Sequence, residues 1–256
     1  MIGNVRNLYK VLTESRNSAR QRATLAVIGD SPEAAELASV LGAQRDTRSA
    51  EVVVCVLGRG ESVPGGVEPV VTVSIGSGPG EVTLAGATED AVQQDLIPEL
   101  LDEVDEEFLV PLGMGYDALR RPVCEKLTFN NAKQNAVIGA LPIPGADMPA
   151  IMANQARMVL SIAAIHGEEL SLERARELGG VLAAGLGMRA LARQLVKVIP
   201  FGGWAASSAI AFTGTLVMGR ATIIYFERGK RQPDEDDVEK IKQQAEEDAR
   251  RYQREQ

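Results

Sequence analysis

The pattern of apolar residues changes once along this 256-residue chain, near "PLGMGYD" at residues 111–117. Before that point, short runs of β-branched residues such as "EVVVCVLG" are separated by turns rich in Gly and Pro, which is typical of strands. After it, Ala, Leu, Gly and Met fill long segments with helical spacing. The sequence therefore predicts a small α/β domain followed by an all-α domain.

The first half is predicted to form a small, mostly parallel sheet. Its second strand carries a continuous valine run, which indicates burial on both faces, as in parallel sheets. The connection between the third and fourth strands is short for a parallel crossover, so a hairpin at residues 73–82 is the alternative. The strands are expected at residues 23–29, 49–58, 69–75 and 82–86, with a helix at 32–41 and an acidic, largely helical segment at 89–107.

Long helices are predicted for the second half, at residues 116–140, 147–166, 172–198 and 203–228. The whole chain is thus predicted to consist of four regions. These are an amphipathic leading helix at 1–22, an α/β domain at 23–112, a helical domain at 116–228 and a charged C-terminal helix or tail at 229–256.

The stretch "LAVIGDSPEAAELASVLG" at residues 25–42 runs from strand through glycine turn to helix, where nucleotide-binding proteins hold phosphate. Of the pattern G-x-x-x-x-G-K-[ST], only Gly29 matches. Ala34, Ala35 and Glu36 stand where the second glycine, the lysine and the magnesium-binding hydroxyl are needed. A single glycine also fails the dinucleotide fingerprint. We therefore expect Ser31 to cap the helix, and we expect neither nucleotide nor another cofactor to bind.

Other catalytic patterns are missing from the sequence. His166 is the one histidine, no G-x-S-x-G motif occurs, and Cys55 and Cys124 lie in apolar contexts typical of buried thiols. A net charge of −8 disfavours nucleic acid as a partner. The chain is therefore expected not to be an enzyme and to hold no metal.

No charged residue occurs between residues 198 and 219, a length borderline for a membrane-spanning helix. A basic amphipathic face precedes this stretch, which is typical of helices that bind anionic lipid. The alternative is a basic face exposed to water or paired with the acidic segment at 89–107. The candidate contacts to lipid or to a protein partner are Arg189, Arg193, Lys197, Phe201 and Trp204.

The segments "LPIPGADMPA" and "ALARQL" lie within a stretch, residues 127–228, that resembles the bacterial YcjF-like helical domain of unknown function. That domain often accompanies Era-like GTPase domains, and the resemblance implies a membrane setting and no catalytic activity for the helical part. It also implies that the first half is a trimmed GTPase. "VSIGSG" stands in place of Asn-Lys-x-Asp, "TLAGA" in place of Ser-Ala-Lys, and residues 42–49 leave no room for switch regions.

The leading hypothesis is a non-enzymatic, membrane-associated adaptor or scaffold with a nucleotide-free pseudo-GTPase domain. It would lie at the cytoplasmic face of the inner membrane, either peripheral or inserted as a hairpin. The first alternative is a soluble, cytoplasmic helical module for interaction or homo-oligomerisation. In it four arginines of the helices, Arg157, Arg189, Arg193 and Arg220, would pair with Asp147 or Glu177. The second alternative is a GTPase or another NTP-binding protein.

Overall fold

The computed structural model describes residues 13–15, 17, 19–140, 147–170 and 203–254. The predicted helix at 172–198 and most of the leading helix lie outside the described residues. The chain divides into two compact units, Ser18–Val123 and Met1–Asn17 with Cys124–Gln256, and each is described by itself. Helix α6 (Asp117–Gly139) contributes residues to both units.

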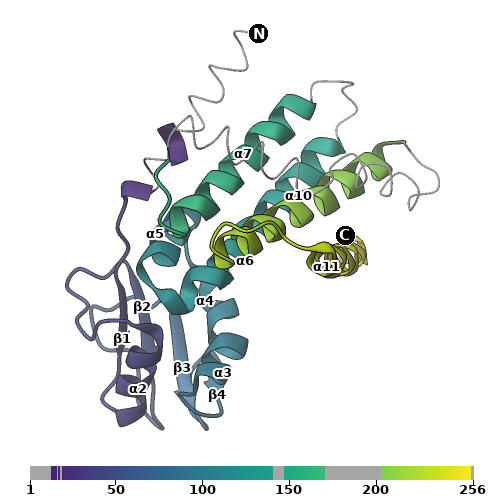
Figure 1. Ribbon diagram of the computed structural model, residues 1–256. Coiled ribbons are helices and arrows are strands. Elements are labelled where there is room, and N and C mark those ends of the chain that lie inside the picture. Colours follow the sequence, from purple (N-terminus) through teal and green to yellow (C-terminus); the bar gives the residue numbers. More distant parts are fainter. Residues whose placement is uncertain (1–12, 16, 18, 141–146, 171–202, 255–256) are drawn as a thin grey trace. The chain divides into compact units, whose positions relative to one another are not determined.

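The α/β unit contains a sheet of four strands, all parallel, in the order β1-β2-β3-β4 (Figure 1). This confirms the predicted fold class, and the hairpin alternative at 73–82 is wrong. β2 is buried along its whole length, as its valine run predicts. The strands are β1 (Leu25–Ile28), β2 (Val52–Val56), β3 (Val71–Ile75) and β4 (Val82–Leu84).

The short connection between β3 and β4 is possible because glycines let the chain run back directly over β3. A Cβ on Gly80 would lie 2.5 Å from the backbone nitrogen of Ser74, and one on Gly78 would lie 2.9 Å from the Ser74 Cβ. The Ser74 hydroxyl accepts a hydrogen bond from the Gly80 N–H at 2.7 Å. A residue with a side chain at Gly80 would therefore push this return segment off the sheet.

Helix α2 (Pro32–Leu41) follows β1 and packs against it. Ser31 caps it, as predicted, since its hydroxyl accepts from the Ala34 N–H at 3.3 Å, and Gly42 ends it in the left-handed conformation. The remaining helices of this unit, besides the start of α6, are α3 (Glu89–Ala91), the π-helical η1 (Val92–Leu96), α4 (Ile97–Glu103) and α5 (Glu106–Gly115). η1 packs on β4 and α4 on β3, which completes the core of the unit.

The helical unit contains the second part of α6, α7 (Asp147–Ile165), α10 (Gly203–Glu227) and α11 (Glu235–Arg254) (Figure 1). α10 packs against both α7 and α11. α6 and α10 approach closely, because a Cβ on Gly219 of α10 would lie 2.3 Å from the Thr128 Cγ2 of α6. Gly167 follows α7 with a positive φ of 80°, a conformation that commonly ends helices.

Candidate functional site

A cavity of about 500 Å³ lies in the α/β unit at the carboxyl ends of β1 and β2. Ligands of open parallel sheets bind at this edge, so the cavity is the candidate ligand site of the α/β unit. The loop after β1 contributes Gly29 and Asp30, the segment after α2 contributes Arg45 and Asp46, and the loop after β2 contributes Glu61.

The glycine turn of this cavity is occupied by contacts within the protein. A Cβ on Gly29, whose φ is 142°, would lie 2.7 Å from the carbonyl oxygen of Val56, so the glycine allows β1 and β2 to remain paired. The Arg45 guanidinium donates to the Gly29 carbonyl. The Ala34 N–H, one of the donors that a phosphate would need, already donates to Ser31.

Acidic side chains outnumber basic ones around the cavity. Its lining contains three acidic residues, Asp30, Asp46 and Glu61. Arg45 is the one basic residue that lines it. The Glu61 carboxylate accepts from the Gly58 N–H at 2.6 Å. This surrounding disfavours a phosphate, because a carboxylate about 4 Å from a phosphate oxygen costs roughly 4 kcal/mol at an effective dielectric of 20.

Two titratable groups near the cavity have shifted pKa values. Burial, and secondarily the charge of Glu61, raise the pKa of the Cys55 thiol, which keeps it protonated. The hydrogen bonds from Arg48 lower the pKa of Asp46, which keeps this carboxylate charged. Within the described parts of the chain, no three His, Cys, Asp or Glu side chains group closely enough to hold a metal ion.

The helical unit contains a layer of amide and hydroxyl side chains that the sequence analysis missed. We call Asn135, Asn154, Gln155 and Thr215 the amide layer. The Asn135 amide donates to the Thr215 hydroxyl at 2.9 Å, and Gln155 donates to the same hydroxyl at 3.1 Å. Asn154 donates to the Asn135 carbonyl oxygen at 3.0 Å. The layer therefore ties α6, α7 and α10 together with its buried polar groups hydrogen-bonded.

A second cluster joins α10 to α6 and α11. The Arg220 guanidinium lies 3.1 Å from a Glu125 oxygen and 2.6 Å from an Asp248 oxygen, and its side chain is 15% exposed. Burial alone lowers the pKa of Arg220, but the two carboxylates outweigh it, so the pKa is raised. Glu177 and the side chain of Asp147, the predicted partners of the arginines, lie outside the described residues. Arg220 pairs with Glu125 and Asp248, and the ion-pair partner of Arg157 is Glu14, at 2.7 Å.

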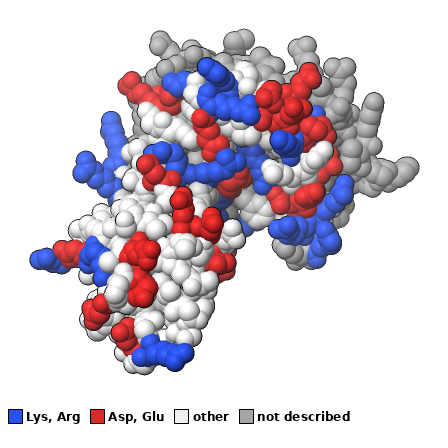
Figure 2. Space-filling view, turned by 60° about the horizontal axis from the view of Figure 1, so that its bottom comes forward, with Lys and Arg blue, Asp and Glu red and all other residues white. Residues whose placement is uncertain are grey.

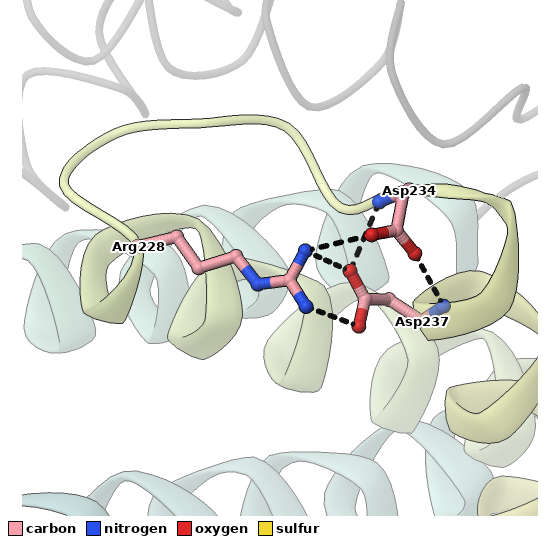
Figure 3. Close-up of polar contacts among 3 residues, drawn as sticks. All are labelled: Arg228, Asp234 and Asp237. Atoms are coloured by element: carbon pink, nitrogen blue, oxygen red, sulfur yellow. Dashed lines mark hydrogen bonds and ion pairs between the residues drawn. The ribbon is translucent and has the colours of Figure 1, made fainter.

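The turn between α10 and α11 is fixed by three side chains, drawn in Figure 3. The Asp234 carboxylate accepts from the Asp237 N–H at 2.9 Å, and Asp237 accepts from the Asp234 N–H at 3.0 Å, which is a reciprocal cap at the start of α11. Arg228, directly after α10, donates to both carboxylates. The Asp237 N–H bond, followed by the bond from Arg228, lowers the pKa of Asp234.

α11 runs back along α10 from this turn. Its buried residues include Ile241, Ala245 and Ala249, and Tyr252 near its end stacks on Phe212 of α10 with ring centroids 4.6 Å apart. The charged C-terminal segment thus covers α10 from its end back to Phe212. On the face drawn in Figure 2, acidic and basic side chains are interspersed, and the coloured residues form no continuous basic field.

Among the residues that the structure describes, two helical segments are apolar and long enough to cross a membrane, Met148–Ile165 and Ser207–Glu227. Half of the first window and two thirds of the second are buried within the protein, so length and composition alone do not distinguish a span from a core helix.

Four of the predicted contact residues, Arg189, Arg193, Lys197 and Phe201, lie outside the described residues. Trp204 lies in the first turn of α10, where the backbone alone is described. The structure therefore does not show whether these five residues come together.

Three comparisons place the chain among known proteins. Residues 117–251 match the family model described as "Domain of unknown function (DUF697)". A relative, magnetosome membrane protein 22 of Magnetospirillum gryphiswaldense, is 28% identical over 156 residues, which are 57% of this chain and 66% of the relative. No solved structure matches the chain significantly. Because the family model covers more than half of the sequence, from α6 through most of α11, the chain belongs to the DUF697 family.

Proposed function

We propose that the protein is a non-enzymatic, membrane-associated adaptor whose α/β unit is a pseudo-GTPase that holds no nucleotide. The observation that carries the nucleotide part is the occupied glycine turn. Gly29 is needed for the close approach to Val56, its carbonyl is bound by Arg45, and the Ala34 N–H is bound by Ser31. The turn thus has an internal structural role that requires no phosphate.

The strand order supports a trimmed nucleotide-binding fold. A doubly wound sheet of order 3-2-1-4-5-6 that loses its second and third strands retains four parallel neighbours in chain order, as β1 to β4 are. Gln44 makes an isolated parallel bridge to Ala26 at the open edge of β1, where a lost strand would pair. This bridge also satisfies backbone groups of the edge, which limits pairing with other chains.

The membrane part of the proposal rests on the family and on the two apolar helical segments. The relative from Magnetospirillum carries the name of a membrane protein, and the matched family includes the whole of α7 and α10. We place the protein at the cytoplasmic face of the inner membrane. There its α/β unit would present a surface to a protein partner. Within the described residues this unit has an occupied glycine turn and no metal-binding cluster.

The test combines two measurements on the full chain. A fluorescent GTP analogue is titrated with millimolar magnesium, and binding to vesicles of phosphatidylcholine and phosphatidylglycerol is measured by flotation. We expect no saturable nucleotide binding and a vesicle-bound fraction that is the same with and without GTP. Saturable binding at micromolar concentration would refute the pseudo-GTPase, and failure to float would refute the membrane association.

A soluble helical module, monomeric or homo-oligomeric, is the second candidate. The burial of the two apolar segments favours it, because half of Met148–Ile165 and two thirds of Ser207–Glu227 are buried within the protein, as in core helices. Light scattering of the full chain without detergent distinguishes the two candidates. A monodisperse particle that does not bind vesicles supports the soluble module.

A further inference from the structure

Charged residues are distributed unevenly along the helical unit, and the amide layer separates a zone that contains them from a zone that contains none. Beyond this layer lie residues 136–139 of α6, 148–153 of α7 and 203–214 of α10, none of which is charged. We call these three segments the helical tip. They lie at one end of the unit, because a Cβ on Gly139 would lie 3.0 Å from the carbonyl oxygen of Ser207 (Figure 1).

Apolar side chains are exposed at the helical tip. Val137 is 60% exposed, Met148 57% and Met152 61%. They are three of the four large apolar residues that are exposed in the described part of the chain. An apolar end of this kind, with charged residues confined to the other side of a polar layer, is typical of a surface that contacts a membrane or another protein.

The position of α11 excludes a full crossing of the membrane by α10 in this arrangement. Tyr252 stacks on Phe212 and Asp248 pairs with Arg220, so the charged helix lies beside the second half of the apolar window. A bilayer around the whole window would also enclose the charged residues of the last turns of α11. Those residues are Glu246, Glu247, Asp248, Arg250, Arg251 and Arg254.

The part of α10 that α11 does not cover is about as long as one leaflet of a bilayer is thick. From Phe212 back to Gly203, α10 extends about 14 Å at 1.5 Å per residue, against about 30 Å for the hydrocarbon core of a bilayer. Asp147, the first residue of α7, limits the depth further. On insertion scales a carboxylate costs about 2.5–3.5 kcal/mol at the bilayer centre, and the cost is highest there.

We infer that the helical tip enters one leaflet of the membrane without crossing it, as a monotopic anchor, and that α11 sets the limit of its insertion. The inference rests on the proposed membrane association and specifies its mode. Lipid covers Val137, Met148 and Met152, while the amide layer lies near the headgroups and the Arg220 cluster remains in water.

The depth is measured on the full chain through its single tryptophan, Trp204, in the first turn of α10. The vesicles contain phosphatidylcholine and phosphatidylglycerol, with bromine atoms either high on the acyl chains or near their ends. We expect the chain-end bromines to quench Trp204 more strongly, because Trp204 precedes Thr215 of the amide layer by about 16 Å of helix, roughly the thickness of one leaflet. Stronger quenching by the high bromines would place Trp204 near the headgroups, as a full crossing by Ser207–Glu227 would, and would overturn the inference, and so would flotation without quenching.

A pair of double variants tests which surface inserts. Met148→Glu with Met152→Glu adds two charges at the helical tip, and the control, Gln244→Glu with Gln253→Glu, adds two on exposed positions of α11. We expect the tip variant to lower vesicle binding about tenfold or more, and the control to retain it. Circular dichroism establishes that both remain folded.

Flotation distinguishes a failure of the membrane association from a failure of the monotopic insertion. If the wild-type protein does not float, the membrane association itself is refuted. If it floats and both double variants float equally well, the monotopic insertion alone is refuted.

Discussion

The close approach of α6 and α10 at Gly219 makes a quantitative prediction. A Cβ at this position would lie 2.3 Å from the Thr128 Cγ2, 2.4 Å from its Oγ1 and 2.9 Å from its Cβ. Rotation of the threonine side chain cannot relieve all three contacts, so Gly219→Ala must move the helices apart. Overpacking costs about 1–3 kcal/mol, and the better helix propensity of alanine recovers up to about 1 kcal/mol. We expect a net loss of about 1–2 kcal/mol.

Two further variants make this prediction specific. Thr128→Ala removes the two closest contacts, so Gly219→Ala should cost about 1 kcal/mol less in that background. Gly214→Ala in the same helix is the matched control, because its Cβ would meet nothing within 4 Å, and it should stabilise by up to about 1 kcal/mol. Urea denaturation followed by circular dichroism measures the free energies of unfolding of the wild type, the three single variants and the double variant. Additivity of the two substitutions within about 0.5 kcal/mol would refute the predicted contact.

Three other substitutions test the remaining clusters. Gly29→Ala forces a side chain onto the Val56 carbonyl at an unfavourable φ, so the α/β unit should lose about 2–4 kcal/mol in urea denaturation. Arg220→Met removes the ion pairs to the partly exposed Glu125 and Asp248 carboxylates and should cost about 1–3 kcal/mol, less than the loss of a fully buried pair, in the same assay. Asp234 has a folded pKa below its ordinary value, so its contribution is present at neutral pH and is lost as the pH falls below roughly 4. Amide exchange at the start of α11 should therefore accelerate in acid, and Asp234→Asn should reduce this dependence; an unchanged acid response in the variant would contradict the role of this carboxyl.

Local signals predicted several elements closely. α2 was predicted at 32–41 and occupies Pro32–Leu41, because Ser31, Pro32 and Gly42 mark its ends through capping chemistry that acts over a few residues. The continuous valine run of β2 likewise predicted a strand buried on both faces. Such features depend on neighbours in sequence, so a single sequence contains them.

Features that depend on distant contacts were missed or mispredicted. The return of the chain over β3 depends on the fit of Gly80 against Ser74, which no spacing rule describes. Asn135 and Asn154 are polar residues next to the apolar ends of their helices, a signal that could have suggested paired amides, but their partners depend on how the helices pack. Asp248, the partner of Arg220 in α11, was missed because that segment was predicted only as a charged helix or tail, with no contact to α10.

The membrane and nucleotide claims meet in one measurement, flotation of the full chain on vesicles of phosphatidylcholine and phosphatidylglycerol in the presence and absence of magnesium and GTP. The occupied turn at Gly29 predicts that the protein floats to the same extent in both conditions. A vesicle-bound fraction that changes with GTP would contradict the account, because the α/β unit would then respond to a nucleotide that we propose it does not bind.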